Sequence, residues 1–154
     1  EQIDFIVELI RRYNLVYVED PLDEEDFEGF AELTAKSRSC LFCGDDLFTT
    51  DTERLSHGIK LHAGNAIIIK PNQIGTLSDT LKAVEMAKEA DYVPVASHRS
   101  GETCDSYLAH LAVGYECPVI KLGVVGGERL AKVNELLRIE EALGYKARVA
   151  RLDL

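Results

Sequence analysis

One seven-residue stretch, Ser97 to Thr103, brings together an imidazole, a guanidinium and a hydroxyl in His98, Arg99 and Ser100. It follows a short apolar run and precedes a helical pattern, so we predict that it lies where a strand passes into a helix. In parallel α/β proteins, ligands bind at this junction. A guanidinium beside a hydroxyl suits an oxygen-rich anion such as a phosphate or carboxylate. His98 is open between a base, a metal ligand and a hydrogen-bond donor.

Ionisable side chains also end the other apolar runs of the sequence. Glu19 and Asp45 end the first two runs, and two neighbouring carboxylates suggest a Mg²⁺ site. Lys70 follows three isoleucines and is a candidate general base, because a lysine enclosed near cations loses its proton more readily. The alternative for Lys70 alone is a snorkelling side chain. Lys121 ends the last run and is interpreted as a charge clamp.

The competing interpretation of the acidic residues is helix capping and loop solvation. We prefer it for Asp20, Asp23 and Asp51, and we place Asp51 at the N-cap of the following helix. Glu19 and Asp45 differ because each directly ends a buried run, which favours the metal interpretation for these two residues.

The spacing of the strand-like runs predicts the fold that positions these residues. After an amphipathic helix over residues 3–13, strands begin about 26 residues apart, near positions 15, 41, 66, 93 and 118. A helical pattern follows each, which predicts parallel βα units. A doubly wound sheet and an incomplete (βα)8 TIM-type barrel both fit. The barrel is favoured because it brings all strand ends to one point, whereas an open sheet separates them by about 4.8 Å per strand.

The composition limits the possible partners and compartments. The net charge of −10 over 154 residues argues against a surface for nucleic acid or anionic membrane. The sequence has no apolar run near the length that crosses a bilayer. Four cysteines without a secretory signal predict free thiols in a reducing, cytoplasmic location. Cys40 and Cys43 are expected in a buried strand and not at a zinc site, which needs further ligands.

The motifs together resemble the enolase family, and the match covers most of residues 15–143. The resemblance includes an archaeal style, carried especially by the turn over residues 124–127. Five motifs carry it, in the family's order: Glu19-Asp20-Pro21, Gly44-Asp45-Asp46-Leu47, Lys70-x-Asn72-Gln73-Ile74-Gly75, Ser97-His98-Arg99-Ser100-Gly101-Glu102-Thr103 and Glu128-Arg129-Leu130-Ala131-Lys132.

The resemblance implies a function and a role for each residue. It implies a lyase of glycolysis that dehydrates 2-phosphoglycerate to phosphoenolpyruvate with Mg²⁺. Lys70 is then the catalytic base that takes the C2 proton, and Glu19 and Asp45 are metal ligands. The substrate is implied to contact Glu19, Lys70, His98, Arg99, Ser100 and Lys121, with Arg99 and Ser100 on its phosphate and Lys121 at its carboxylate.

The resemblance also implies that residues 1–154 are the C-terminal part of the family's catalytic barrel. An N-terminal domain and the first barrel strands, with a further aspartate ligand and the catalytic acid, are then expected elsewhere. We therefore expect the isolated segment to be inactive, and to form homo-oligomers or associate with the missing barrel half. Two alternatives stay open: a truncated binding or assembly domain without catalysis, and another enolase-superfamily lyase or isomerase acting on a carboxylate.

Overall fold

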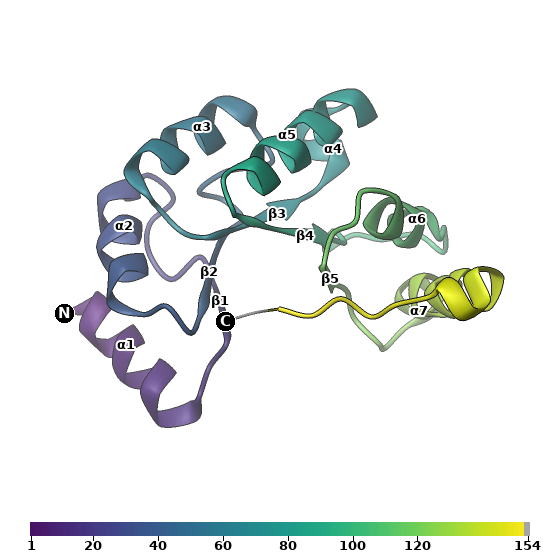
Figure 1. The fold of residues 1–154 in the computed structure, drawn as a ribbon, viewed down its shortest axis with the longest axis horizontal. Helices are drawn as coiled ribbons and strands as arrows, with labels where there is room; N and C mark the ends of the chain where they lie inside the picture. The colour runs from purple at the N-terminus through teal and green to yellow at the C-terminus, as the bar shows by residue number, and fades with distance from the viewer. Residues whose placement is uncertain (153–154) are drawn as a thin grey trace. The chain divides into compact units, whose positions relative to one another are not determined.

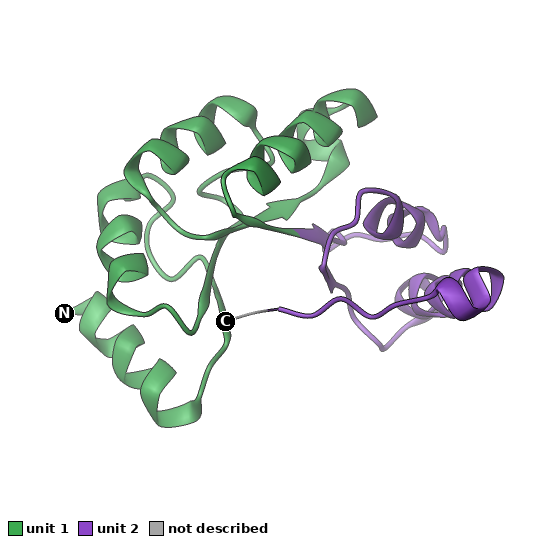
Figure 2. Cartoon of the chain, viewed as in Figure 1, with its two compact units in different colours: residues 1–94, 153–154 green, residues 95–152 purple. Residues whose placement is uncertain are grey.

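The computed structural model describes residues 1–152, which form two compact units (Figure 2). Unit 1 contains residues 1–94 and unit 2 contains residues 95–152. The assignment of residues 1–154 to one part of a barrel domain stays a prediction. The last two of these residues lie outside the described part of the chain. The predicted order is confirmed: one helix and then five strands alternating with helices.

Unit 1 contains three complete βα repeats built on parallel strands. Tyr17 pairs with Leu41, and Cys43 pairs with Ala66, so the first three strands run side by side in chain order. In Figure 1 the helices of this unit lie on one side of its strands, as in a barrel wall and unlike a doubly wound sheet. The elements are α1 (Gln2–Tyr13), β1 (Tyr17–Glu19), α2 (Phe27–Lys36), β2 (Leu41–Gly44), α3 (Thr52–Leu61), β3 (Ala66–Ile69), α4 (Pro71–Ile74), α5 (Leu77–Glu89) and the start of β4 (Val93–Ser97).

The core of unit 1 lies between its strands and its helices. Every residue of β2 and β3 is buried, as expected for strands covered on both faces. One apolar cluster joins the buried side of α1 to α2 and β2, through Ile6, Val7, Ile10, Leu33, Cys40 and Phe42. Cys40 and Cys43 are fully buried free thiols, as predicted. Cys43 lies in β2, whereas Cys40 directly precedes this strand. Burial raises the pKa of the Cys40 thiol to about 11, so it remains protonated.

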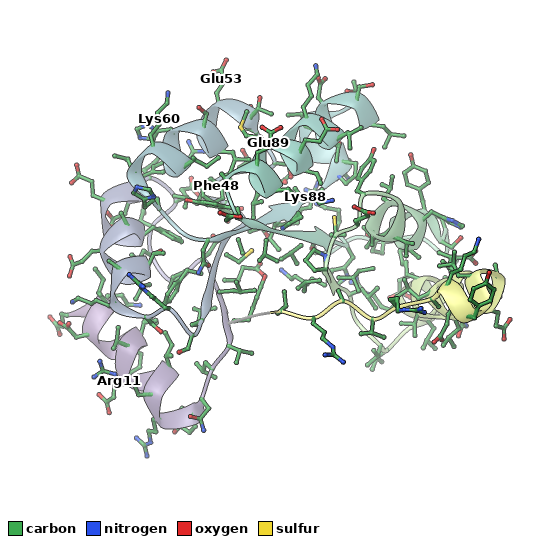
Figure 3. All side chains as sticks on the ribbon, viewed as in Figure 1. Arg11, Phe48, Glu53, Lys60, Lys88 and Glu89 are labelled. Atoms are coloured by element: carbon green, nitrogen blue, oxygen red, sulfur yellow. The ribbon has the colours of Figure 1, made fainter. Side chains whose placement is uncertain are left out.

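Phe48 is the centre of a second part of this core, directly after the second strand. Its ring makes edge contacts with Phe27 and Tyr92, each with ring centroids 6.2 Å apart. A Cβ at Gly44 or Gly58 would lie 2.6 or 2.5 Å from this ring, so both positions require glycine. Figure 3 shows Phe48 inside unit 1, whereas charged side chains such as Glu53 and Lys60 point away from the ribbon. This packing fixes the end of β2, where Asp45 begins the site.

Unit 2 contains the remaining residues of β4 and the last repeat. Val95 pairs with Val119 and Ser97 with Lys121 in a parallel register. Ala96, Leu108 and Ala112 form its small apolar cluster. The helical pattern predicted after the last strand is confirmed as α7 (Gly127–Leu143), whose buried residue is Lys132. The elements are α6 (Tyr107–Gly114), β5 (Val119–Lys121), α7 (Gly127–Leu143) and the 3-10 turn η1 (Gly144–Lys146).

Local signals account for most helix ends. Asp51 caps α3 as predicted, because its carboxylate accepts hydrogen bonds from the N–H groups of Glu53 and Arg54 at 2.8 and 2.9 Å. The short helix α4 was missed by the sequence analysis, although Pro71 at its first position and the left-handed Gly75 at its end are typical signals. In the described residues, each helix is too short or too polar to cross a membrane.

Candidate active site

The ends of β1, β2 and β3 bring the predicted metal ligands and base of unit 1 to one edge of the sheet. Glu19 is the last residue of β1, Asp45 directly follows β2 and Lys70 directly follows β3. These strands are parallel and paired in register, so their carboxyl ends meet at the same edge. The predicted proximity of Glu19, Asp45 and Lys70 is therefore explained by strand order alone.

Lys70 and Asp45 form a nearly buried ion pair. The Lys70 ammonium lies 2.7 and 2.5 Å from the two carboxylate oxygens of Asp45. Their side chains are only 12% and 10% exposed, so water screens the pair weakly. Both Asp45 oxygens thus face the ammonium, and the snorkelling alternative for Lys70 is wrong: its charge is held inside the site.

Thr50 fixes the backbone beneath Lys70. This fully buried hydroxyl accepts a hydrogen bond from the Lys70 N–H at 2.9 Å and donates to the Gln73 side-chain oxygen at 2.8 Å. Thr50 has φ of +58° and follows Thr49 at φ +49°, a left-handed conformation that is unfavourable for β-branched residues. Such strain costs on the order of 1–3 kcal/mol per residue and persists where surrounding contacts enforce it. Here it aims a hydroxyl at the backbone N–H of the candidate base Lys70.

Glu19, Asp20 and Asp45 form an acidic cluster at the same edge. Each offers a carboxylate oxygen, and these oxygens all lie within 4.8 Å of one another. Hard oxygen donors at this separation fit a small divalent cation. The Tyr17 hydroxyl donates a hydrogen bond to Glu19 Oε2 at 2.9 Å, which orients that carboxylate. The residues present therefore fit the predicted Mg²⁺ site.

Asp20 corrects one sequence interpretation. We expected helix capping or loop solvation, but its two carboxylate oxygens accept the backbone N–H groups of Asp45 and Asp46, each at 2.9 Å. Burial raises the pKa of Asp20, and the two N–H bonds act in the opposite direction. Asp20 therefore holds the turn that carries Asp45. The α2 cap is Asp26, which accepts from the Gly29 N–H, while Asp23 accepts from Glu25 N–H in the preceding turn.

The Ser97–Thr103 stretch lies in unit 2 at the end of a strand, as predicted: Ser97 is the last residue of β4, and the loop follows it. The His98 N–H donates to the Lys121 carbonyl at 3.1 Å, so the strand pairing continues to the start of the loop. The Arg99 N–H donates to Glu102 Oε1 at 2.7 Å, which folds the loop back on itself. Unit 2 thus brings His98 beside the backbone of Lys121, and it places Arg99 and Ser100 in the adjoining turn.

Helix α7 holds this loop through Arg129. The Arg129 guanidinium donates to Nδ1 of His98, to the Arg99 carbonyl at 2.9 Å and to the Ser100 carbonyl at 3.1 Å. Its side chain is 16% exposed. One planar guanidinium therefore joins three successive residues of the loop, which a single ammonium cannot do with the same geometry.

Lys132, one turn further along α7, fixes the second half of the loop. Its side chain is 1% exposed, and its ammonium donates to the carbonyls of Thr103 and Asp105 at 2.6 and 2.7 Å. It also lies 2.8 Å from Glu102 Oε2. Burial alone would raise the pKa of Glu102, but the hydrogen bonds from Arg99 N–H and Lys132 outweigh it and lower the pKa. The sequence motif over residues 128–132 contains Arg129 and Lys132 but predicts no role for either.

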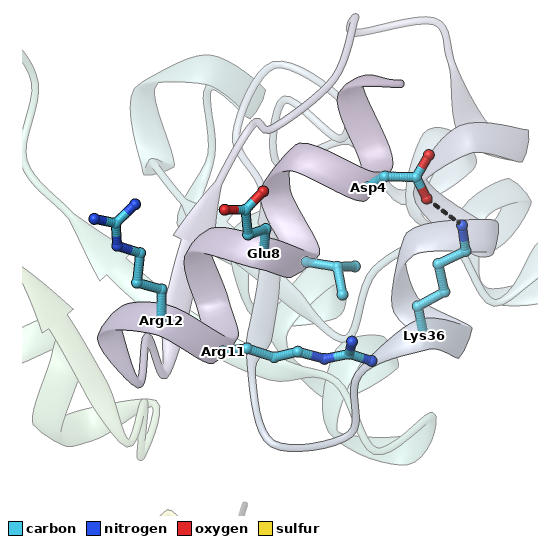
Figure 4. A pocket seen from close by; sticks show the side chains of 6 residues that line it. Asp4, Glu8, Arg11, Arg12 and Lys36 are labelled. Atoms are coloured by element: carbon cyan, nitrogen blue, oxygen red, sulfur yellow. Dashed lines mark hydrogen bonds and ion pairs between the residues drawn. The ribbon is translucent and has the colours of Figure 1, made fainter.

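One hollow of the described surface lies away from these residues. It measures about 850 Å³ and lies on the outer face of α1 and the end of α2 (Figure 4). Lys36 reaches across it to Asp4 at 3.1 Å. Its lining mixes both charges and contains none of the candidate catalytic residues: Asp4, Val7, Glu8, Arg11, Arg12 and Lys36. The candidate catalytic residues therefore lie outside this hollow.

Comparison with known proteins identifies relatives over nearly the whole chain. Residues 1–153 match the family model described as "Enolase, C-terminal TIM barrel domain". The enolase of Methanosphaera stadtmanae is 62% identical over 144 residues, which cover 93% of this chain and 35% of the relative. The enolase of Natronomonas pharaonis is 62% identical over 141 residues, covering 91% and 35%. That of Methanothermobacter thermautotrophicus is 58% identical over 146 residues, covering 94% and 35%. The chain thus spans about a third of the length of these archaeal relatives.

Proposed function

The chain belongs to the family of the enolase C-terminal TIM barrel domain, and from this premise we propose that the complete protein dehydrates 2-phosphoglycerate to phosphoenolpyruvate in glycolysis. The observation that carries the proposal is the Lys70–Asp45 pair beside Glu19 and Asp20 at adjoining strand ends. It combines a candidate base with carboxylates for a divalent cation, which are the groups needed to remove a proton next to a carboxylate.

Lys70 is the proposed base of the reaction. Its Nζ accepts the proton from C2 of the substrate, the electron pair of that C–H bond forms the C2–C3 double bond, and the C3 hydroxyl leaves. The acid that protonates the leaving hydroxyl is assigned to the part of the relatives' length that this chain does not cover. Lys70 must be neutral to accept this proton, and its ammonium is held by both carboxylate oxygens of Asp45.

Glu19 and Asp45 are the proposed ligands of Mg²⁺, with Asp20 fixing the turn before Asp45. When bound, Mg²⁺ supplies positive charge that stabilises the negative charge developing on the substrate carboxylate. Asp45 is also the partner of Lys70, so its carboxylate links the metal site to the base. This shared carboxylate makes both proposed roles dependent on one side chain.

The residues of unit 2 are assigned to the rest of the substrate. Arg99 and Ser100 bind the phosphate, because a guanidinium and a hydroxyl match its oxygen atoms. Lys121 is assigned to the substrate carboxylate by charge, and His98 contacts the substrate through its ring. The loop that carries Arg99 and Ser100 is held by Arg129 and Lys132, which supports a fixed anion site.

The test is the activity of the purified complete protein with 2-phosphoglycerate and Mg²⁺, followed by the ultraviolet absorbance of phosphoenolpyruvate. We expect Lys70→Ala to lower kcat by about 10³-fold or more, within the usual contribution of a general base. Lys60→Ala, which removes an exposed lysine of α3, is the matched control and leaves kcat unchanged. Wild-type protein that turns over only a carboxylate lacking phosphate would favour the superfamily alternative. Retention of activity by Lys70→Ala would overturn the assigned base.

The isolated 154-residue chain is expected to be inactive and to associate. It carries the proposed base without the acid, so no hydratase activity is expected from it with Mg²⁺. We also propose a cytoplasmic location, and homo-oligomerisation or association with the remaining barrel half. Light scattering tests the association, and a clean monomer of the isolated chain contradicts it. Robust turnover by the isolated chain contradicts the proposal that the catalytic acid lies outside residues 1–154.

A further inference from the structure

The contact between Arg129 and His98 determines which ring nitrogen of His98 carries the proton. An arginine side chain has five N–H donors and no acceptor, and it stays protonated at all physiological pH values. Because Arg129 Nη1 contacts Nδ1 of His98, that nitrogen must be the acceptor. In a neutral imidazole the proton then resides on Nε2.

The surroundings of the ring agree with this assignment. A proton on Nδ1 would place two N–H groups against each other, beside a permanent positive charge. The Glu102 carboxylate is already engaged by the Arg99 N–H and the Lys132 ammonium. Its two hydrogen-bonded oxygens are therefore directed to the loop backbone and to α7, whereas the Arg129 guanidinium contacts Nδ1 of His98.

We propose that Arg129 is a positioning residue that fixes His98 with its proton on Nε2, so that His98 donates a hydrogen bond to an oxygen atom of the substrate and does not accept the C2 proton. The assignment of the oxygen rests on the proposed function, whereas the position of the proton rests on the Arg129 contact alone. A proton on Nε2 selects the hydrogen-bond donor among the three roles that the sequence leaves open for His98, which were base, metal ligand and donor. Lys70 then remains the proposed base.

The same guanidinium explains why arginine is needed at this position. It holds the carbonyls of Arg99 and Ser100 at 2.9 and 3.1 Å while it contacts His98. The ring orientation and the proposed phosphate-binding turn are thus set by one side chain on α7. A lysine at position 129 would keep the charge, but its single ammonium cannot reproduce the planar arrangement of N–H donors that contacts both carbonyls and the His98 ring.

The direct test is ¹⁵N NMR of the imidazole nitrogens in the complete, histidine-labelled protein at a mildly alkaline pH. The signals that disappear in His98→Gln assign the ring. We expect Nδ1 of His98 to show the shift of an unprotonated nitrogen and Nε2 that of a protonated one. In Arg129→Met we expect shifts averaged between the two tautomers. Arg138→Met is the control, because Arg138 lies on the same helix with a 65% exposed side chain.

Kinetics give a second readout that does not depend on the Arg129 variants folding. The amide of glutamine can donate near the position of Nε2 but cannot act as a base. We expect His98→Gln to keep kcat/KM within about tenfold of wild type, while His98→Ala loses on the order of 10²-fold, as for a lost transition-state donor. Equal losses in the two variants would contradict the donor role.

The two readouts separate failure of this proposal from failure of the proposed function. Wild-type protein without hydratase activity refutes the function, while the NMR measurement still decides the tautomer. A protonated Nδ1 in the wild type overturns the proposal whatever the activity. Identical His98 shifts in the wild type and a folded Arg129→Met variant overturn the positioning role of Arg129.

Discussion

Replacing Lys132 with methionine tests how α7 holds the loop. Methionine has a similar length and fills the same space, but it removes the ammonium that contacts Glu102 and the carbonyls of Thr103 and Asp105. The substitution leaves the Glu102 carboxylate, whose side chain is 12% exposed, without its cation. Breaking one partner of a buried ion pair costs about 3–5 kcal/mol in the free energy of unfolding. Since Glu102 keeps some contact with water and the Arg99 N–H, we expect about 3 kcal/mol.

The assay is equilibrium urea unfolding of the complete protein, followed by circular dichroism. Adding Glu102→Gln to Lys132→Met removes the uncompensated charge and should recover about half of the loss, because two unpaired carbonyls still cost about 1–3 kcal/mol. Lys82→Met is the matched control: its ammonium pairs with Asp79 on the surface of α5 with a 67% exposed side chain. We expect no measurable change for this control.

Two results would refute this reasoning. A loss below about 1 kcal/mol in Lys132→Met would show that the buried ammonium contributes no more than a surface ion pair. A double variant as unstable as Lys132→Met would show that the isolated Glu102 charge is not the source of the cost. Either result would remove the argument that α7 stabilises the loop through this lysine.

Three further perturbations test other parts of the site. Hydrogen bonds hold the pKa of Glu102 below its ordinary value of 4.5. The ionised Glu102 side chain therefore stabilises the fold above about pH 4.5, and this contribution is lost as the pH falls through the lower pKa of the folded state. The urea midpoint of Glu102→Gln should then fall less steeply with decreasing pH than that of the wild type. Tyr17→Phe removes the donor to Glu19 and should weaken Mg²⁺ binding about tenfold in calorimetry, and unchanged affinity would exclude an orienting role. Thr50→Ala leaves the Lys70 N–H unpaired and should cost about 1–3 kcal/mol in urea unfolding, whereas Thr50→Ser, which keeps the hydroxyl, should cost clearly less.

Much of the architecture followed from the sequence because its signals are local. Apolar runs with a period of about 26 residues predicted the five strands, and Asp51 marked a helix start through its own cap. The order of parallel strands then placed Glu19, Asp45 and Lys70 at one edge of the sheet. Each of these conclusions needs only neighbouring residues and the geometry of the βα repeat.

Only the tertiary structure decided which partner each side chain selects. The contacts of Arg129 with His98 and of Lys132 with Thr103 join residues 31 and 29 positions apart. The pattern of α7 does not reveal them, because a lysine on a helix is normally exposed. Lys132 is buried because three acceptors of one loop surround its ammonium, an arrangement that exists only after α7 packs beside that loop. The sequence alone therefore determined which candidate groups are present and at which strand ends, and folding determined how these groups pair and how they are oriented.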